Sequence, residues 1–419
     1  MRPILPWINQ HLQLNLSWPE GLRAMRHRNF RLFFFGQLIS VTGTWMQSTA
    51  QQWLVYRLTD SQVSLGAVTF AGFIPVLFLS LFMGVIVDRF PRRRLLVWTQ
   101  TWFLLLAAVL ALITYLEIVQ YWQILLLATL LGLGTSLDMP ARQTLYADLV
   151  EREDLLNAIA LNSSMFNVAR IIGPAVSGVI IASVGEAPAF AINSLSYLAV
   201  IAGLLLMRLT PRSHPKTAAT GLTSFKEGIG YLRRDRRVLG LVSMTALLSL
   251  LVYPYLVLLP VFARDILKIG VEGFGGLMSA RGFGALIGAL LLALLGSRQH
   301  KGRQLMLSRV LLTFAAAGLA VSRTPQLSIL MLLLAGYALI TQLAVTNTLI
   351  QLVVPEELRG RVISAYTWAL GGFWPVGSLL MGWFGDKFQA PTAVLIAAGA
   401  SALLTLLEHA VFPNTRRLR

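Results

Sequence analysis

Charged side chains inside long apolar stretches are the residues of this sequence best placed to do chemistry. Asp138 and Arg142 stand four residues apart in SLDMPARQ, so a helix would bring them together on one face. A carboxylate beside an arginine can exchange a proton, or it can serve only as a structural ion pair. Arg170 and Arg281 each interrupt an apolar stretch, where a guanidinium can bind an anion or pair with a helix carbonyl or a nearby acid.

Other reactive groups lack the pattern that catalysis or metal binding needs. The five histidines are scattered without metal-ligand spacing, and the absence of cysteine excludes disulfides and thiolate ligands. The sequence has no Gly-x4-Gly-Lys-Ser/Thr loop for a nucleotide phosphate. We therefore expect neither an enzyme nor an ATP-driven pump, and we expect no cofactor and no metal site.

The composition predicts a protein that lies in a lipid bilayer. Hydrophobic residues make up 56% of the 419 residues and charged residues only 13%, with a mean hydropathy of +0.68. A soluble domain has about 25% charged residues. Twelve apolar stretches are long enough to cross a membrane as helices, which takes about 20 residues each. They are 30–56, 64–87, 95–116, 122–144, 155–183, 187–208, 238–262, 273–296, 305–321, 327–350, 360–385 and 391–412.

The basic residues predict how these helices are oriented. With both termini in the cytoplasm, 28 of the 35 Lys and Arg fall on the cytoplasmic side, five on the opposite side and two inside helices. This follows the positive-inside rule and accounts for the net charge of +17 without nucleic acid as a partner. We expect a multi-pass protein of the cell (inner or plasma) membrane whose basic surface meets anionic lipid. Glu117, Asp386 and Glu408 stand near the ends of the stretches, where we expect them to be solvated.

The chain divides into two halves of six helices each, separated by its longest polar segment. Within that segment apolar and basic residues alternate over 225–237, which indicates an amphipathic helix on the membrane surface, with a disordered linker as the alternative. A weak repeat supports the division: LVEREDLLNAIALNSS begins at Leu149 and LVVPEELRGRVISAYT at Leu352. The expected parts are a cytoplasmic N-terminal segment, the first half, a cytoplasmic central loop, the second half and a cytoplasmic basic tail: 1–29, 30–208, 209–237, 238–412 and 413–419.

The break between the second and third stretches, GVIVDRFPRRRLL, carries an unusual concentration of charge. It resembles the loop motif of the major facilitator superfamily, Gly-x-x-x-Asp-Arg-x-Gly-Arg-Arg, with Pro91 in place of the second glycine. The matching residues are Gly84, Asp88, Arg89, Arg92 and Arg93. The resemblance implies an all-α polytopic membrane protein with twelve transmembrane helices in two six-helix halves. A carboxylate at a helix end can hold a guanidinium or the N-terminus of a neighbouring helix and so act as a gate, whereas the alternative is a topological anchor.

Three further stretches are similar to one branch of that superfamily, which includes the enterobactin exporter and related bacterial efflux proteins. They are VTGTWMQSTAQQWLVYRLTDS, DMPARQTLYADLVEREDLLNAIALNSSMFNVARIIGPAVSG and VVPEELRGRVISAY. Exporters of the superfamily carry a glycine-rich motif on the fifth helix, and this chain has small residues and a proline at its positions. These are Ala160, Ala169, Gly173, Pro174, Ser177 and Gly178. The resemblance implies export; close packing of helices, which any direction of transport can use, is the alternative.

The first stretch is too polar to face lipid, so it must face protein or water. Together with polar and aromatic residues of other helices it predicts a large cavity suited to an amphiphile. The candidate cavity residues are Gln37, Trp45, Arg170, Asn193, Tyr197, Arg281, Asn347, Trp368 and Trp374. Hydrogen bonding between helices is the alternative for each of them.

These observations and the resemblance imply a secondary active transporter that exports a small amphipathic or anionic molecule by alternating access. A drug, a siderophore or a lipid-like metabolite would fit that description. The resemblance also implies proton coupling, for which Asp138 with Arg142 is the candidate site. The alternative function is an uptake symporter or facilitator for a small nutrient on the same fold. We expect a monomer.

Overall fold

In the computed structural model the described residues, 19–208, 221–295 and 300–411, form helices joined by short connections, without a strand. The helices of the first half are α1 (Arg28–Thr59), α2 (Gln62–Arg89), α3 (Arg92–Tyr115), α4 (Tyr121–Leu149), α5 (Leu155–Val184) and α6 (Glu186–Leu206). Those that follow are α7 (Gly221–Leu232), α8 (Arg236–Leu251), α9 (Leu259–Val261), α10 (Gly270–Leu295), α11 (Lys301–Val321), α12 (Pro325–Val353), α13 (Glu356–Phe388) and α14 (Ala390–Val411). Short helical turns are η1 (Glu20–Arg26), η2 (Arg152–Asp154), η3 (Tyr253–Leu258) and η4 (Phe262–Ile266).

Eleven of the twelve predicted apolar stretches each coincide with one helix, with ends that differ by up to five residues. Among the described residues, ten segments are long and apolar enough to cross a membrane by themselves. The two predicted helices outside that group are α1 and α13. Both contain many polar residues and lie between other helices, so neither needs to be apolar all round.

The seventh predicted helix is interrupted. α8 ends at Leu251 and is followed by η3, the single turn α9 and the π-type turn η4. Pro254 and Pro260 stand in this region, and each lacks the N–H that a continuous helix would use. The irregular backbone is enclosed by protein, since almost every residue from Val252 to Ala263 is buried.

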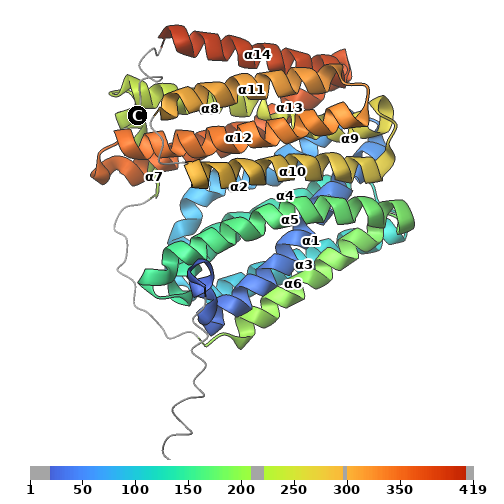
Figure 1. The fold of residues 1–419 in the computed structure, drawn as a ribbon. Coiled ribbons are helices and arrows are strands. Elements are labelled where there is room, and N and C mark those ends of the chain that lie inside the picture. Colours follow the sequence, from blue (N-terminus) through green and yellow to red (C-terminus); the bar gives the residue numbers. More distant parts are fainter. Residues whose placement is uncertain (1–18, 209–220, 296–299, 412–419) are drawn as a thin grey trace, which may run out of the picture.

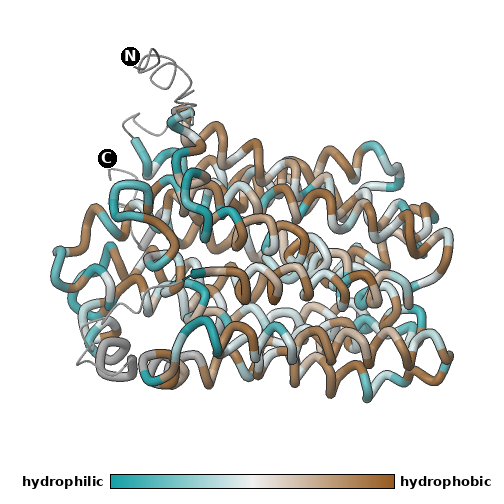
Figure 2. The backbone as a smooth tube through the Cα atoms, turned by 90° about the horizontal axis from the view of Figure 1, so that it is seen from below, coloured by the Kyte–Doolittle hydropathy of each residue, from teal (hydrophilic) through white to brown (hydrophobic). Residues whose placement is uncertain are grey.

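The two halves form two bundles that face each other, as Figure 1 shows with the first half in blue to green and the second in yellow to red. The pairs α5–α10 and α2–α13 make the main contacts between the halves. Apolar residues cover most of the length of the helices, and hydrophilic residues gather toward helix ends and connections (Figure 2). This distribution is that of a multi-pass membrane protein, whose helix sides meet lipid.

At the α5–α10 contact the halves touch at one end of the bundle and separate at the other. We call the end with α7 and the α2–α3 turn the basic end, and the opposite end the far end. At the far end Trp53 of α1 stacks on Phe274 of α10, with ring centroids 6.0 Å apart. Toward the basic end α5 and α10 diverge (Figure 1), and Leu156 and Leu294 are 81% and 77% exposed.

α7 lies at the basic end and packs on α13. The helix predicted within 225–237 is present, but it begins earlier and ends earlier, and Asp235 caps the next helix instead. Glu227 of α7 pairs with Arg361 of α13 at 2.6 Å, and Gly228 allows close approach to the Arg361 carbonyl. The helix is therefore fixed to the second half rather than lying on its own.

The expectation that Glu408 is solvated is wrong. Glu408 is 6% exposed and forms an ion pair with Arg309 of α11, itself 2% exposed. The pair lies between α11 and α14, inside the second half. A single charge at this depth would be costly, and the partner on the facing helix removes that cost.

Candidate functional site

A cavity of about 580 Å³ lies between the two halves. Its walls come from α1, α2, α4, α5 and α6 on one side and from η3, α10, α12 and α13 on the other. The walls are mainly apolar and aromatic, with Trp45, Phe73 and Trp374 among the large side chains. A site of this size and character suits a small amphipathic ligand.

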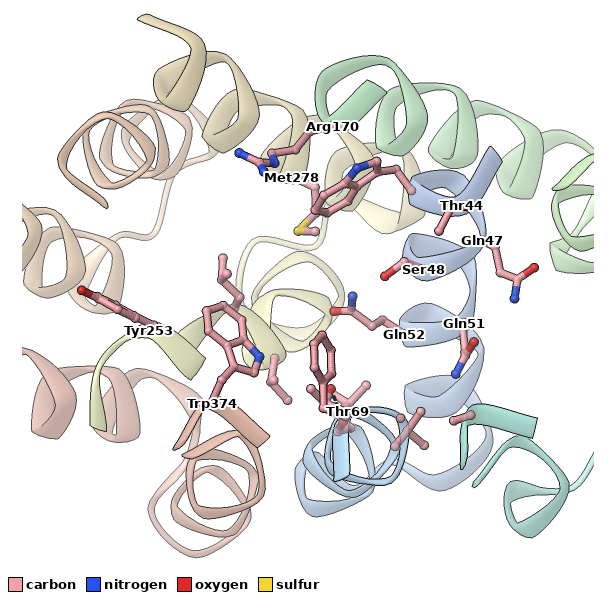
Figure 3. Close-up of a pocket in the computed structure, with 18 of the residues that line it drawn as sticks. Thr44, Gln47, Ser48, Gln51, Gln52, Thr69, Arg170, Tyr253, Met278 and Trp374 are labelled. Atoms are coloured by element: carbon pink, nitrogen blue, oxygen red, sulfur yellow. Dashed lines mark hydrogen bonds between the residues drawn. The ribbon is translucent and has the colours of Figure 1, made fainter. Parts of the chain in front are cut away.

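One face of α1 supplies most of the neutral polar groups of the cavity. Thr44, Ser48 and Gln52 stand on successive turns of the helix and border the open space in Figure 3. Gln47 turns toward α6, where Asn193 donates a hydrogen bond to its side-chain oxygen at 2.7 Å. Polar residues recur along this face every three to four positions, which is the period of a helix. That pattern in the sequence could have identified Ser48 and Gln52 as cavity residues, but the list of predicted cavity residues did not include them.

Arg170 and Arg281 are the only charged residues in the described lining of the cavity. Arg170 comes from α5 and Arg281 from α10, so each half contributes one guanidinium. Arg170 lies 5.3 Å from the Trp45 ring, a cation–π contact, and it donates a long hydrogen bond to Asn167 at 3.4 Å. In the described part of the chain neither guanidinium has a carboxylate partner, and the Nε of each is buried without a hydrogen bond.

The backbone brings these two residues together at the crossing of α5 and α10. Ser279 donates to the Ile171 carbonyl at 2.7 Å, and Gly282 sits directly against the Arg170 carbonyl. A Cβ at Gly282 would lie 3.0 Å from that carbonyl oxygen, a tight contact that a larger residue could make only if the helices moved slightly apart. The close crossing places both guanidiniums at the boundary between the halves.

Of the nine predicted cavity residues, five line this cavity: Trp45, Arg170, Tyr197, Arg281 and Trp374. The other four lie elsewhere. Gln37 accepts from Arg142, Asn193 is fully buried behind Gln47, and Asn347 bonds to Gln351 at 2.5 Å. Trp368 packs edge-to-face on Phe373.

Asp138 and Arg142 form the predicted pair on α4, and the pair belongs to a larger network. The Asp138 carboxylate accepts from Thr99 and Gln100 of α3, both at 2.7 Å, and from Arg142 at 2.5 and 3.0 Å. Arg142 also donates to Gln37 of α1. Asp138 is 5% exposed, so this network ties α1, α3 and α4 together inside the first half.

The predicted gating motif spans the end of α2 and the start of α3. The side chain of Asp88 and the surroundings of Gly84 lie outside the described residues. Arg89 is exposed, Arg92 pairs with Asp148 of α4 at 2.7 Å, and Arg93 donates to the Leu205 carbonyl at 2.6 Å. The described contacts of the motif thus stay within the first half, and its gating role remains a prediction.

The small residues of the predicted helix 5 motif allow two close helix contacts. Gly173 packs on α1, where an added Cβ would lie 2.6 Å from the Trp45 Cβ, and Ser177 donates to the Met46 carbonyl at 2.9 Å. Gly178 faces Val271 of α10, and the Pro174 carbonyl meets Gly275. Ala169 is fully buried and Ala160 is exposed. The motif therefore holds α5 between α1 and the opposite half.

Polar contacts close the far end of the cavity between the halves. Arg264 pairs at 2.5 Å with Asp60, the residue that follows α1, and lies over the Tyr56 ring at 4.0 Å, and Tyr56 donates to Asp265. The Asp386 carboxylate of α13 accepts hydrogen bonds from the start of α2. The sequence predicted none of these contacts, because hydropathy carries no information about partners, and Asp386 was expected only to be a solvated acid near a helix end.

A second unpredicted cluster lies at the basic end of the first half. Asp154 is buried and pairs with His27 and Arg26, both at 2.7 Å, and with Arg23 at 3.4 Å. The hydrogen bond from His27 lowers the pKa of the Asp154 carboxyl, and the charges of Arg26 and Arg23 lower it further. This cluster fixes η1 against the start of α5.

Two helical halves around an aromatic cavity that is closed at one end define a secondary transporter of the major facilitator fold. The sequence profile of the transmembrane secretion effector family matches residues 20–416. The chain belongs to this family.

Characterised relatives are transporters. The chain is 27% identical over 382 residues to the staphyloferrin A transporter of Staphylococcus aureus, which covers 90% of this chain and 95% of the relative. It is 26% identical over 399 residues to the multidrug efflux pump Tap of Mycolicibacterium fortuitum, and this match covers 92% of this chain and 96% of Tap. Among solved structures, the chain is similar to the nucleoside transporter NupG, with a TM-score of 0.76 over 92% of this chain and 99% of NupG. The two sequences are only 16% identical, so this similarity shows the fold alone. The relatives support a role in transport and efflux.

Proposed function

We propose that this protein is a secondary active transporter that exports a small amphipathic or anionic molecule by alternating access. The observation that carries the proposal is the central cavity, which is aromatic and closed at the far end, and whose described lining residues include two arginines and no acid. The resemblance of the chain to efflux pumps supports the outward direction. In the structure described here the site would receive its substrate from the basic end.

We further propose that the basic end faces the cytoplasm of a cell whose inner or plasma membrane holds the protein as a monomer. The distribution of Lys and Arg supports this orientation. On this assignment both termini and the central loop are cytoplasmic, and the two six-helix halves move against each other during transport. Contacts between the halves are concentrated in α2, α5, α10 and α13, which supports such a movement.

The proposed proton site is Asp138 with Arg142. Its position in a buried network that connects three helices of the first half supports a role in coupling, because protonation would break an ion pair and alter the contacts of α1, α3 and α4. The network lies outside the lining of the central cavity. Coupling by this site would therefore act through helix position and not by direct competition with substrate.

Transport into inside-out vesicles tests the proposal. Vesicles that contain the protein would be energised to be acidic inside, and uptake of amphipathic dyes of different charge would be followed by fluorescence. Accumulation above that of vesicles without the protein is expected for at least one dye. Absence of accumulation for every dye, together with counterflow of a nutrient in proteoliposomes, would favour uptake as the function instead.

A further inference from the structure

We propose that the transported molecule carries two oxyanion groups, one bound by Arg170 and the other by Arg281. This inference deepens the proposed function and rests on it. The described residues that line the cavity include two arginines and no carboxylate. Guanidinium groups bind carboxylate or phosphate through two parallel hydrogen bonds, which makes such a group the natural partner for each arginine.

The described neighbours of Arg170 and Arg281 supply no negative charge, so a bound ligand would have to supply it. Arg170 has the Trp45 ring and a long hydrogen bond to Asn167, and Arg281 has the Tyr255 hydroxyl as a neighbour. All of these groups are neutral. The two guanidiniums carry the same charge and come from helices that cross closely, with Gly282 of α10 against the Arg170 carbonyl of α5. One monoanion would neutralise half of this charge, whereas two oxyanion groups would neutralise all of it.

The position of the two arginines explains why binding could be linked to movement. Arg170 belongs to the first half and Arg281 to the second, so a ligand that binds both connects the halves. The aromatic side chains Trp45 and Trp374, with Met278, provide a surface for an apolar body between the acidic groups. The predicted substrate is thus an organic dianion with an apolar body.

Binding of matched dyes to the purified protein in lipid nanodiscs tests the inference. Carboxyfluorescein carries acidic groups on a xanthene body, and a cationic rhodamine has the same body without them. We expect carboxyfluorescein to bind at least tenfold more tightly. Arg170→Gln and Arg281→Gln should each weaken its binding about tenfold or more, whereas Arg170→Lys and Arg281→Lys should retain part of it. Arg237→Gln, which removes an exposed arginine paired with Asp235 outside the cavity, is the matched control and should change nothing.

Equal affinity for both dyes, or unchanged carboxyfluorescein binding in the two glutamine variants, would overturn the inference. Failure of the inference is distinct from failure of the proposed function. Vesicles that accumulate the rhodamine but not carboxyfluorescein would support export and contradict the dianion. Vesicles that accumulate neither dye, with arginine-dependent carboxyfluorescein binding to the purified protein, would support the dianion and contradict export.

A second inference follows from an independent feature, the contact between α13 and the start of α2. The Asp386 carboxylate accepts from the Ser61 hydroxyl at 2.7 Å and from the backbone N–H groups of Gln62 at 2.6 Å and Val63 at 3.1 Å. These N–H groups belong to the first turn of α2 and have no partner within the helix. A carboxylate from the second half therefore caps a helix of the first half, at its positive end.

The sequence around Asp386 repeats the sequence of the predicted gating motif. α13 ends in Gly382-x3-Asp386-Lys387-Phe388, and α2 ends in Gly84-x3-Asp88-Arg89-Phe90. α2 and α13 pack on each other with Gly382 against Gln62 and Gly66 against Ser378, both at the far end. The same residue pattern thus stands at the C-terminal ends of the two helices that meet across the halves.

We infer that Asp386 is a latch that holds the far end closed and that must release when the transporter opens to that side. The three hydrogen bonds exist only while the halves touch at the far end. The counterpart at the basic end would be the gate predicted for Asp88. The transporter would then alternate between two helix caps at opposite ends of one helix pair.

Distances between spin labels can test the latch, since the chain contains no cysteine and labels can be added at chosen sites. One label pair, at Glu117 and Thr324, reports on the far end, and a second pair, at Glu153 and Glu357, on the basic end; all four residues are exposed. Asp386→Ala should lower the ratio of molecules closed at the far end to molecules open there about fivefold. This corresponds to the change in free energy expected when one helix cap is lost. Asp386→Asn, whose amide oxygen can still accept, should shift it less.

Glu186→Gln is the matched control. Glu186 is also an acid at the far end, but it pairs with Arg57 inside the first half at 2.7 Å. We expect this variant to leave both distance distributions unchanged. Unchanged distributions in Asp386→Ala, or equal shifts in both variants, would overturn the latch. Thermal unfolding of each variant shows whether a shift reflects opening or loss of the fold.

Discussion

Replacement of Asp138 by asparagine should destabilise the protein strongly, because both carboxylate oxygens accept hydrogen bonds and one of them balances the charge of Arg142. The carboxylate accepts from Thr99, Gln100 and Arg142, while an amide keeps one acceptor oxygen and adds two N–H donors. In either orientation of the amide, a donor faces Arg142 or the α3 side chains. Arg142 also loses its counter-charge.

The magnitude follows from burial. Asp138 is 5% exposed, and the side chain of Arg142 is 17% exposed. Removal of one partner from a buried ion pair costs about 3–5 kcal/mol. Because Arg142 retains some contact with solvent, we expect about 3 kcal/mol. The double variant Asp138→Asn with Arg142→Gln removes both charges and should recover most of the loss, so that it differs from the wild type by about 1 kcal/mol.

Thermal unfolding in detergent measures the stability, and vesicle transport with an imposed pH gradient measures coupling. If Asp138 is the proton site, the stable double variant should lose the part of transport that depends on the gradient. A double variant with undiminished gradient dependence would show that the pair is structural. An Asp138→Asn variant as stable as the wild type would refute the account of the network itself.

Three further predictions concern packing and pH. Glu408→Gln should cost about 3–5 kcal/mol of stability by leaving Arg309 unpaired in the core, and Arg309→Met with Glu408→Leu should restore it, as thermal unfolding would measure. Gly173→Val should cost about 1–3 kcal/mol because α1 leaves no room for the side chain, while Gly276→Val, with nothing within 4 Å of the added Cβ, should be neutral. Asp154→Asn should speed trypsin cleavage at Arg23 and Arg26 by freeing η1. Because the pKa of Asp154 is lowered in the folded state, its contribution should persist above the unfolded-state pKa of about 3.9 and disappear only as pH falls below it.

The helices and the family were predictable from sequence because both depend on local patterns. The lengths of the apolar stretches predicted the twelve helices, and the charged motif around Asp88 indicated the superfamily. The interruption after Leu251 was not predicted, since Pro254 and Pro260 lie in an apolar stretch whose average hydropathy hides them. Membrane helices tolerate proline, so its presence alone did not separate a kink from a break.

The candidate site was only partly predictable, because it depends on which helix faces meet. Arg170 and Arg281 were found as charges in apolar stretches, but their proximity depends on the α5–α10 crossing. Asn193 and Gln37 have the polarity expected of cavity residues, yet both satisfy neighbouring helices within the first half. Asp386 and Glu408 stand at similar depth near helix ends. One caps a helix and the other is buried in an ion pair, a difference that only the neighbouring helices determine.

On the proposals above, the sign of the cavity charge determines which step of the cycle the membrane potential drives. The empty cavity holds two positive charges, Arg170 and Arg281, and a bound dianion makes it nearly neutral. Movement of the loaded site to the outside then transfers little charge. Return of the empty site toward a negative cytoplasm moves positive charge inward, which is favoured by about 2.3 kcal/mol for each elementary charge that crosses 100 mV. The potential can therefore drive export by resetting the empty transporter, and a proton bound at Asp138 would add to this driving force rather than supply all of it.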